Sequence, residues 1–391
     1  MNKRIWLMTT VLMAACSEGG GRSGSGGQGN VAGEGGSAAG GSGAGGREQT
    51  GGGNATGGSG GRETGGTAGT GDNVTGGAGG NATGGNATGG ASTGGVAAGG
   101  TGGAAVVVPV AMGNVYRFSW DTKVVDIDAS KGGRITVFSL GGKNILTGPS
   151  ANPDNYGSTF WPSPQSVWGW PPPAEIDQDA YTARTDAATL ILESKNSTEV
   201  NLMVTKRITV DRAAQALVIV YDMKNTGSAA AVWAPWEITR VAPGGVTFFE
   251  LGPGGTAPVG TSIPAALETA AGWHWFDDAA LQISDNTARK TFADGKGWLA
   301  HLARADRLLL VKTFEDIGAN AHAKDEAEVE IFVDSARKYV EVENQGTALS
   351  LAPGATRSWT VRWLLRALPG NGALSVGATE VVDAVKAILP R

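Results

Sequence analysis

The chain has 391 residues, with 31 basic and 36 acidic side chains and a formal net charge of −5 at pH 7. This balance disfavours a surface that binds nucleic acid or anionic lipid. One cysteine in the whole chain excludes an internal disulfide.

Residues 1–15 have the pattern of an export signal. Lys3 and Arg4 precede an apolar run, IWLMTTVLMAA, that ends at Ala15. This run is too short to stay in a bilayer as a spanning helix. We therefore expect residues 1–15 to be a signal peptide, and the globular part of the chain to lie outside the cytoplasm.

Cys16 follows two small residues at the end of this run. The stretch LMAAC resembles the lipobox of bacterial lipoproteins, except that Met13 stands where that motif usually has leucine. The resemblance implies a lipid on Cys16, with Ser17 favouring the outer membrane in a Gram-negative cell. Acyl chains would then anchor the protein. The alternative is an incidental cysteine within a signal peptide.

Residues 16–105 are of low complexity and contain most of the 64 glycines. So few apolar side chains cannot offset the conformational entropy that folding removes. We predict a disordered, flexible tether over this range, followed by one domain over residues 106–391. The only membrane contact expected is through the N-terminal lipid.

The globular part is rich in strand-like segments such as VNLMVTKRITV and ALVIVYDMKN, in which β-branched residues lie between turn residues. Helical periodicity occurs only in ATEVVDAVKAIL, where Val381, Val382 and Val385 share a face with Ile388 and Leu389. The predicted fold class is therefore all-β: antiparallel sheets stacked as a large sandwich, with a short C-terminal helix.

The stretch WPSPQSVWGWPPP, residues 161–173, combines three tryptophans with five prolines. Proline lacks the amide hydrogen that a sheet ladder uses, and it interrupts helices. We predict an ordered loop that holds large aromatic rings at or near the surface.

Five segments occur in the order GGRITVFSLGGKNIL, TFWPSPQSVWGWPPP, LVIVYDMKNTGSAAAVWAPWEITR, KYVEVENQG and LAPGATRSWTVRWLL. Together they resemble a galactose-mutarotase-like domain, and the resemblance covers most of residues 114–368. The resemblance implies a β-supersandwich with a carbohydrate-binding cleft on one concave face.

In the strand-like stretch YVEVENQG, Glu341 and Glu343 fall on one face, because successive side chains of a strand alternate. A solvated outer face would also explain this pattern, and the residues alone favour that interpretation. The stretch VENQ resembles the LETQ segment of aldose 1-epimerases, whose glutamate is the general base. The resemblance assigns that role to Glu343.

An epimerase needs a second group that can donate a proton to the sugar. The family uses a histidine, but here Trp236 and Glu237 stand at that place. Glu237 would serve only with a raised pKa, from burial or a neighbouring carboxylate. His274, between two tryptophans, is the substitute acid that we consider, whereas His301 in an apolar strand is expected to be a core residue.

His322 lies close in sequence to Asp325, Glu328 and Glu330, but the spacing matches no metal motif. We expect no metal and no cofactor. If the two acidic strands pair with Glu330 opposite Glu341 and Glu328 opposite Glu343, four carboxylates share one face and repel one another. A shift of one residue would separate them.

Aromatic rings cover the C–H patches of sugars, while carboxylate, amide and guanidinium groups bind the hydroxyls. The alternative is that the rings form a minor core at one end of the sandwich. The residues predicted to bind a sugar are Trp161, Gln165, Trp168, Trp170, Trp236, Arg240, Lys312 and Glu341.

The sequence therefore predicts a lipid-anchored, monomeric carbohydrate-binding protein of the cell envelope. The alternative is an aldose 1-epimerase-like isomerase, or another glycan-processing enzyme that uses paired carboxylates. A structural envelope protein is the third possibility. The missing histidine favours binding, whereas the VENQ glutamate favours catalysis.

Overall fold

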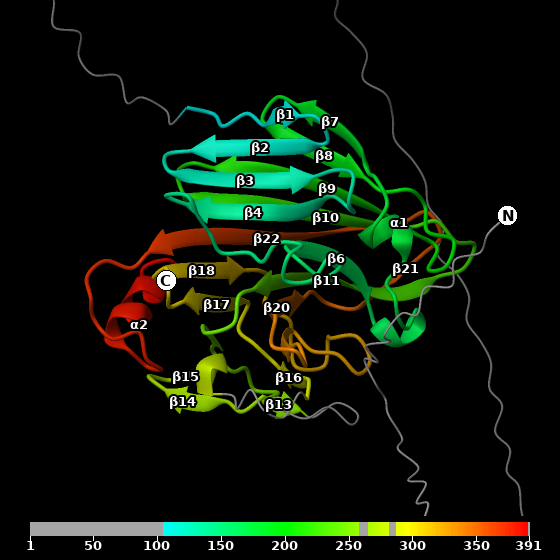
Figure 1. Ribbon diagram of the computed structural model, residues 1–391. Coiled ribbons are helices and arrows are strands. Elements are labelled where there is room, and N and C mark those ends of the chain that lie inside the picture. The colour runs from blue at the N-terminus through cyan, green and yellow to red at the C-terminus, as the bar shows by residue number, and fades with distance from the viewer. Residues whose placement is uncertain (1–104, 258–264, 281–286, 390–391) are drawn as a thin grey trace, which may run out of the picture. The chain divides into compact units, whose positions relative to one another are not determined.

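A computed structural model describes residues 105–257, 265–280 and 287–389 (Figure 1). The signal peptide, the lipidated Cys16 and the tether predicted over residues 1–104 lie outside the described residues. Within them, neither α-helix has the length and apolar character that crossing a membrane would need.

Two antiparallel sheets make up the body of the molecule. The first has the order β1-β2-β3-β4-β6-β11-β20-β19-β16-β13, with β5 paired to β4 and β21 to β11. Its strands are β1 (Val110–Met112), β2 (Val115–Trp120), β3 (Lys123–Asp128), β4 (Arg134–Leu140), β5 (Lys143–Asn144), β6 (Ser158–Ser163), β11 (Ala231–Val241), β13 (Thr256–Ala257), β16 (Arg289–Ala293), β19 (Val329–Val333), β20 (Val340–Gln345) and β21 (Leu349–Leu351).

The second sheet has the order β14-β15-β12-β17-β18-β22-β10-β9-β8-β7. Its strands are β7 (Thr182–Asp186), β8 (Thr189–Glu193), β9 (Leu202–Asp211), β10 (Ala216–Asn225), β12 (Val246–Phe249), β14 (Glu268–Ala270), β15 (Trp273–Asp277), β17 (Trp298–Ala303), β18 (Leu308–Thr313) and β22 (Thr356–Ala367). The helical turns are η1 (Gln165–Val167), α1 (Ala174–Asp177), η2 (Asp278–Ala280) and α2 (Thr379–Lys386).

The main core lies between the two sheets. Burial alternates along β9, where Leu202, Val204 and Ile208 are buried, as the period of two in a strand requires. Figure 1 shows β2, β3 and β4 stacked on β8, β9 and β10. The predicted fold class, an antiparallel β-sandwich with a short C-terminal helix, is confirmed.

A second apolar cluster lies on the far side of the second sheet, under helix α2. Val381, Val382 and Val385 of the helix pack there with aromatic side chains that include Trp273 and Trp275. This confirms the apolar face predicted for the helix. It also shows that the two indoles flanking His274 in the sequence belong to a core and do not form the rim of a cleft.

The loop predicted over residues 161–173 is partly wrong. Its first three residues, Trp161 to Ser163, complete strand β6, and Pro162 lies opposite Pro235 of β11. A pair of prolines fits an antiparallel ladder at a position where neither residue donates to the other. Among the described residues, β4 pairs with β6 only at Ser158, so Pro162 faces no ladder partner on its other side either.

Candidate functional site

The alternation of side chains along β11 divides its polar residues between the two faces of the first sheet. Ile238 lies opposite Glu343 of β20, and Glu237 lies opposite Asn344. Trp236 and Arg240 therefore share the outer face with Glu343, whereas Glu237 points toward the second sheet.

The outer face carries a set of aromatic, charged and amide side chains from neighbouring strands β6, β11, β20, β19 and β16, all of them buried except Lys290, which is partly exposed. We call this set the indole–carboxylate cluster. Its members are Trp161, Trp236, Arg240, Lys290, Glu330, Glu341, Glu343 and Gln345.

A row of indole rings leads from the surface to a carboxylate. Trp170 is 38% exposed, and its ring meets that of Trp161 edge-on with centroids 5.9 Å apart. Trp161 in turn meets Trp236 edge-on at 5.3 Å. The Trp236 Nε1 donates to Glu343 Oε2 at 2.8 Å. The structure thus brings the tryptophans near position 165 next to the carboxylate near position 343.

Two cations partly offset the carboxylates of the cluster. Arg240 Nε donates to Glu341 Oε1 at 2.8 Å. The Lys290 Nζ lies 2.7 Å from Glu330 Oε2 and 3.4 Å from Glu343 Oε2. Gln345 Nε2 donates to Glu330 Oε1 at 2.7 Å. Glu330 and Glu343 are therefore held together through one ammonium group.

Burial changes the acidity of these groups. Removal from water raises the pKa of both Glu330 and Glu343 to about 8, an effect that Lys290 reduces and that neighbouring carboxylates increase. Burial lowers the pKa of Lys290, but Glu330 and Glu343 outweigh it and leave that pKa above its ordinary value. At neutral pH the two carboxyl groups can therefore donate a proton as well as accept one.

Four polar atoms of the cluster are buried without a hydrogen-bond partner. They are Arg240 Nη2, Glu330 Oε2, Glu343 Oε1 and Gln345 Oε1, each on a residue with 0% of its surface exposed, and of these Glu330 Oε2 has the ion pair with Lys290. An unmet buried donor or acceptor costs about 1–3 kcal/mol, so such atoms are rare in folded proteins. Asn344, on the other face of β20, has two such atoms as well. Within the cluster they lie beside the row of indoles, and a polar ligand there would complete the bonding.

The structure does not bring Glu237 and Lys312 to this face, which corrects their assignment to the cleft. Glu237 accepts hydrogen bonds from Tyr221 Oη at 2.6 Å and from Trp363 Nε1 at 2.9 Å. Lys312 Nζ lies 2.7 Å from Glu237 Oε1 and also donates to Thr239 Oγ1 at 2.9 Å. We call these five residues the interior network. Glu237 and Glu343 lie on opposite faces and do not share a cavity.

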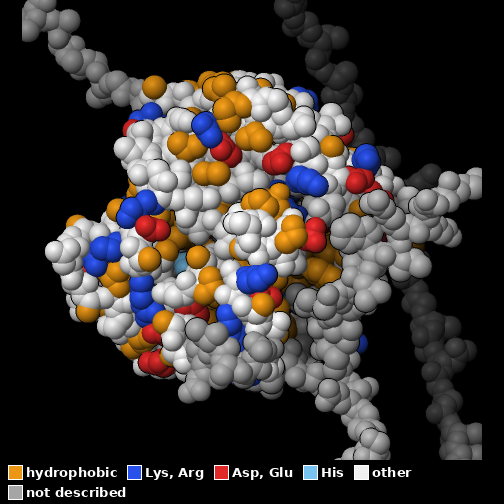
Figure 2. Space-filling model, viewed as in Figure 1, with side chains coloured by type: hydrophobic (Ala, Val, Ile, Leu, Met, Phe, Trp, Pro, Cys, Tyr) orange, Lys and Arg blue, Asp and Glu red, His pale blue; other side chains and the backbone are white. Residues whose placement is uncertain are grey.

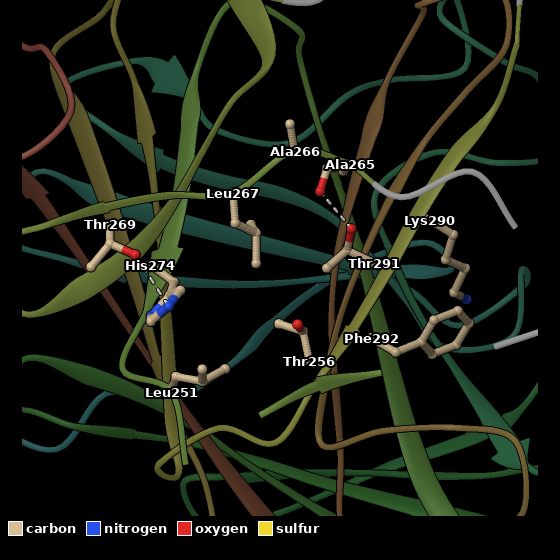
Figure 3. Close-up of a pocket in the computed structure, with 10 residues that line it drawn as sticks. All are labelled: Leu251, Thr256, Ala265, Ala266, Leu267, Thr269, His274, Lys290, Thr291 and Phe292. Carbon is tan, nitrogen blue, oxygen red and sulfur yellow. Dashed lines mark hydrogen bonds between the residues drawn. The ribbon is translucent and has the colours of Figure 1, made fainter. Parts of the chain in front are cut away.

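His274 is also separate from the cluster. It lines a cavity of about 420 Å³ near the edges of both sheets, where its Nε2 lies 3.3 Å from Thr269 Oγ1. Figure 3 shows His274 at one end of this cavity, with Lys290 and Phe292 at the other. Of the residues that line it, Lys290 also belongs to the cluster, and strand alternation puts its side chain on the opposite face of β16 from Thr291.

The remaining loop residues pack against the chain itself. Trp168 is buried, and its Nε1 donates to Pro162 O at 2.7 Å. The side chain of Gln165 bonds Gly169 O, and its backbone amide donates to Glu326 Oε1 at 2.9 Å. Of the predicted sugar-binding rings, Trp170 is thus the one that presents substantial surface to solvent.

The acidic hairpin adopts neither of the registers considered from the sequence. Glu330 lies opposite Glu343, and Phe332 lies opposite Glu341. A shift of two residues keeps every side chain on its predicted face, because the strand period is two. Glu328 accepts instead from the backbone amides of Gly297 and Ile317.

Sequence reasoning missed three members of the cluster. Gln345 lies two residues after Glu343 and thus on the same face, a signal that was present in the pattern. Glu330 was considered from the sequence only as one of four carboxylates on the hairpin, and its contact with Glu343 follows from the observed register. No local signal identified Lys290, since β16 joins this face only through its pairing with β19.

The structure also shows where the other two histidines lie and how acidic, histidine and cysteine side chains are grouped. His301 is buried, its Nδ1 lies 3.0 Å from Thr247 Oγ1, and burial lowers its pKa to about 3. His322 Nδ1 lies 3.0 Å from Ala323 O. Within residues 105–389, leaving aside the two undescribed segments, no group of three acidic, histidine or cysteine side chains is arranged to hold a metal ion.

The surface in the view of Figure 2 shows basic and acidic side chains interspersed, with hydrophobic side chains between them. This face carries no large patch of one charge. It gives no sign of an electrostatic surface for a polyanion.

No family model matches the chain, and no curated protein matches it either. Solved structures with a similar fold include a galactose mutarotase-like protein from Lactobacillus casei, 9% identical over 64% of this chain and 100% of that one, with a TM-score of 0.44. A galactose mutarotase related enzyme from Lactobacillus acidophilus is 10% identical over 66% of this chain and 100% of its own, with a TM-score of 0.44.

A TPR-domain containing protein from Parabacteroides distasonis is 12% identical over 66% of this chain and 48% of its own, with a TM-score of 0.45. These similarities concern the fold. At this level of similarity they say nothing of activity, so a function for this chain must be argued from its own residues.

Proposed function

We propose that this protein recognises carbohydrate through the indole–carboxylate cluster. The observation that carries the proposal is the row of indoles that ends at buried, unpartnered polar atoms on Arg240, Glu343 and Gln345. A sugar offers C–H faces for the rings and hydroxyl groups for the polar atoms. The sequence segments that resemble a galactose-mutarotase-like domain include both the tryptophan-rich stretch and the VENQ strand, and they support the same proposal.

The location belongs to the proposal as well. A signal peptide over residues 1–15 and a lipid on Cys16 would hold the domain outside the cytoplasm at the end of the glycine-rich tether. The test is expression in a bacterial host with Cys16→Ser as the variant. The wild type should partition with membranes and the variant should not. Equal partitioning of the two proteins would contradict a lipid anchor on Cys16.

A glycan array tests recognition, with fluorescence titration of each hit. Trp170→Ala removes the exposed ring, and Trp236→Phe removes the Nε1 that donates to Glu343. The matched control is Trp273→Phe, in the core under α2. Hits should weaken in the first two variants and not in the control. If no hit depends on either ring, the hypothesis of a structural envelope protein is favoured over that of a carbohydrate-binding protein.

A second function is favoured by one observation. Glu330 and Glu343 are buried on the same face with pKa values of about 8, which suits proton transfer near neutral pH. An aldose 1-epimerase-like activity would use Glu343 as base, with Glu330 in place of the missing histidine. NMR measurement of anomeric exchange in glucose and galactose tests it. Exchange that the wild type accelerates and Glu343→Gln does not would support this function; no acceleration would exclude it for those sugars.

A further inference from the structure

The cluster has more buried carboxyl groups than cations. Arg240 pairs with Glu341. Lys290 pairs with both Glu330 and Glu343. It also lies near Glu326, whose pKa burial raises and Lys290 partly lowers again. All three of these carboxyl groups are buried. The single ammonium of Lys290 balances the charge of one of them. The other two carboxyl groups must keep their protons or pair with another cation, because unpaired charge is costly to bury.

The unpartnered atoms next to these groups are mainly acceptors. Glu343 Oε1 and Gln345 Oε1 have no donor, and both residues are fully buried on the same face. A ligand that satisfies them must donate hydrogen bonds. Hydroxyl groups can do so, but only a cationic donor also offsets the excess of carboxylate.

Lys290 already shows that this face holds an ammonium group. Its Nζ lies 4.9 Å from the centre of the Trp236 ring and 5.2 Å from that of Phe292, beside two carboxylates. Aromatic faces and carboxylates together form a favourable environment for a cation. Because Lys290 contacts Oε2 of Glu343, the Oε1 of that group remains for a second cation.

We infer that the saccharide bound by the cluster is an amino sugar with a free, positively charged amine. This inference rests on the proposed carbohydrate function and narrows its ligand class. The ammonium bonds Glu343 Oε1 and Gln345 Oε1, and a sugar oxygen accepts from Arg240 Nη2. Lys290 and Phe292 also line the cavity of about 420 Å³ (Figure 3), which falls in the size range of small-molecule sites.

Binding has a consequence for protons. The charged groups near Glu343 are Lys290 from β16, Glu330 from β19, Glu341 from its own strand, Glu326 from the segment before β19 and Lys312 from β18. Below pH 8, one carboxyl of the Glu330–Glu343 pair keeps its proton in the free protein. A cation beside the pair favours the ionised form. The carboxyl therefore releases its proton to the buffer on binding, while the sugar keeps its own as ammonium.

Calorimetry with glucosamine and N-acetylglucosamine tests the inference, since the acetyl group removes the charge. At about pH 6.5, glucosamine should bind more tightly by about tenfold or more. Titrations in two buffers of different ionisation enthalpy should show net proton release for glucosamine and none for N-acetylglucosamine. Equal affinities, or binding of glucosamine without proton release, would overturn the inference.

Glu343→Gln should abolish the preference for glucosamine, because it removes the charge but keeps the shape of the side chain. The control is Glu380→Gln on α2, which carries a partly exposed ion pair with Arg307 and should keep the preference. If neutral sugars bind as well as glucosamine, the inference fails and the proposed function stands. If no saccharide binds, both fail. The wild-type proton measurement needs no variant to fold.

Discussion

The two faces of strand β11 bury polar side chains in opposite ways. On the inner face, Glu237 accepts hydrogen bonds from Tyr221 and Trp363 and forms an ion pair with Lys312. All three partners lie on the second sheet. On the outer face, Arg240 and its neighbours Glu343 and Gln345 each keep an atom with no partner. A network that the protein completes by itself has nothing left for a ligand, so it acts as a structural link between the sheets. Asn344, opposite Glu237 on the inner face, also keeps its Nδ2 and Oδ1 without a partner, so the contrast is between the interior network and the indole–carboxylate cluster, and the cluster is the set that can bind.

The largest effect expected from this difference is the loss of Lys312. Lys312→Met leaves Glu237 buried without its cation and should lower the free energy of unfolding by about 3–5 kcal/mol. Urea denaturation measures the change. The double variant Glu237→Leu with Lys312→Met, which removes both charges, should recover much of the loss. A loss below about 1 kcal/mol for Lys312→Met would contradict a structural role for the interior network.

The inner face of β11 also shows what could not be predicted from the sequence alone. Alternation correctly placed Glu341 and Glu343 together, because the period of a strand is fixed by its backbone. Alternation cannot say which face meets the second sheet. In WAPWEITR both Trp236 and Glu237 were predicted to line the cleft, and the structure places only Trp236 on the face of Glu343.

The reason is a set of partners that lie far away in the sequence. Glu237 is tolerated inside because Lys312 and Trp363, more than seventy residues later, supply its hydrogen bonds. The fold class was predictable because many short alternating segments require stacked sheets. The residue that lies opposite Glu330 and the position of Lys290 on the outer face depend on pairings between strands, which a single sequence does not display.

The pH dependence of stability should also separate the two faces. The pKa of Glu343 in the folded chain, about 8, exceeds its ordinary value of 4.5, so the folded state binds a proton that the unfolded state releases between these values. Raising the pH through this window therefore lowers the free energy of unfolding, by up to about 1.4 kcal/mol per pH unit for one carboxyl.

Glu343→Gln removes this contribution. Urea denaturation at about pH 5 and about pH 8 should show the wild type losing stability relative to the variant as the pH rises. Subtracting the two proteins cancels the titration of remote groups such as His301. A difference that stays constant over the range would mean that Glu343 is ionised throughout.

A smaller effect comes from a matched pair of indoles. Trp363 donates to Glu237 on the inner face at 2.9 Å, and Trp236 donates to Glu343 on the outer face at 2.8 Å. Trp363→Phe should cost about 1.5–3 kcal/mol, the value of a hydrogen bond to a charged group. Trp236→Phe should cost about 1 kcal/mol or less at neutral pH, because Glu343 can keep a proton. The loss of ring volume is the same in both, so equal costs would remove the distinction between the faces.

The smallest effect on stability is expected for Trp170→Ala, at the exposed end of the indole row. The ring is 38% exposed and touches Trp161 edge-on, so its removal should change the free energy of unfolding by less than about 1 kcal/mol. Sugar binding should weaken by about 0.5–1.5 kcal/mol, as for the loss of one aromatic contact. Denaturation and fluorescence titration on the same sample separate the two quantities. A variant that loses stability but keeps its affinity would place Trp170 with the packing residues of the sandwich, and the binding face would then begin at Trp236.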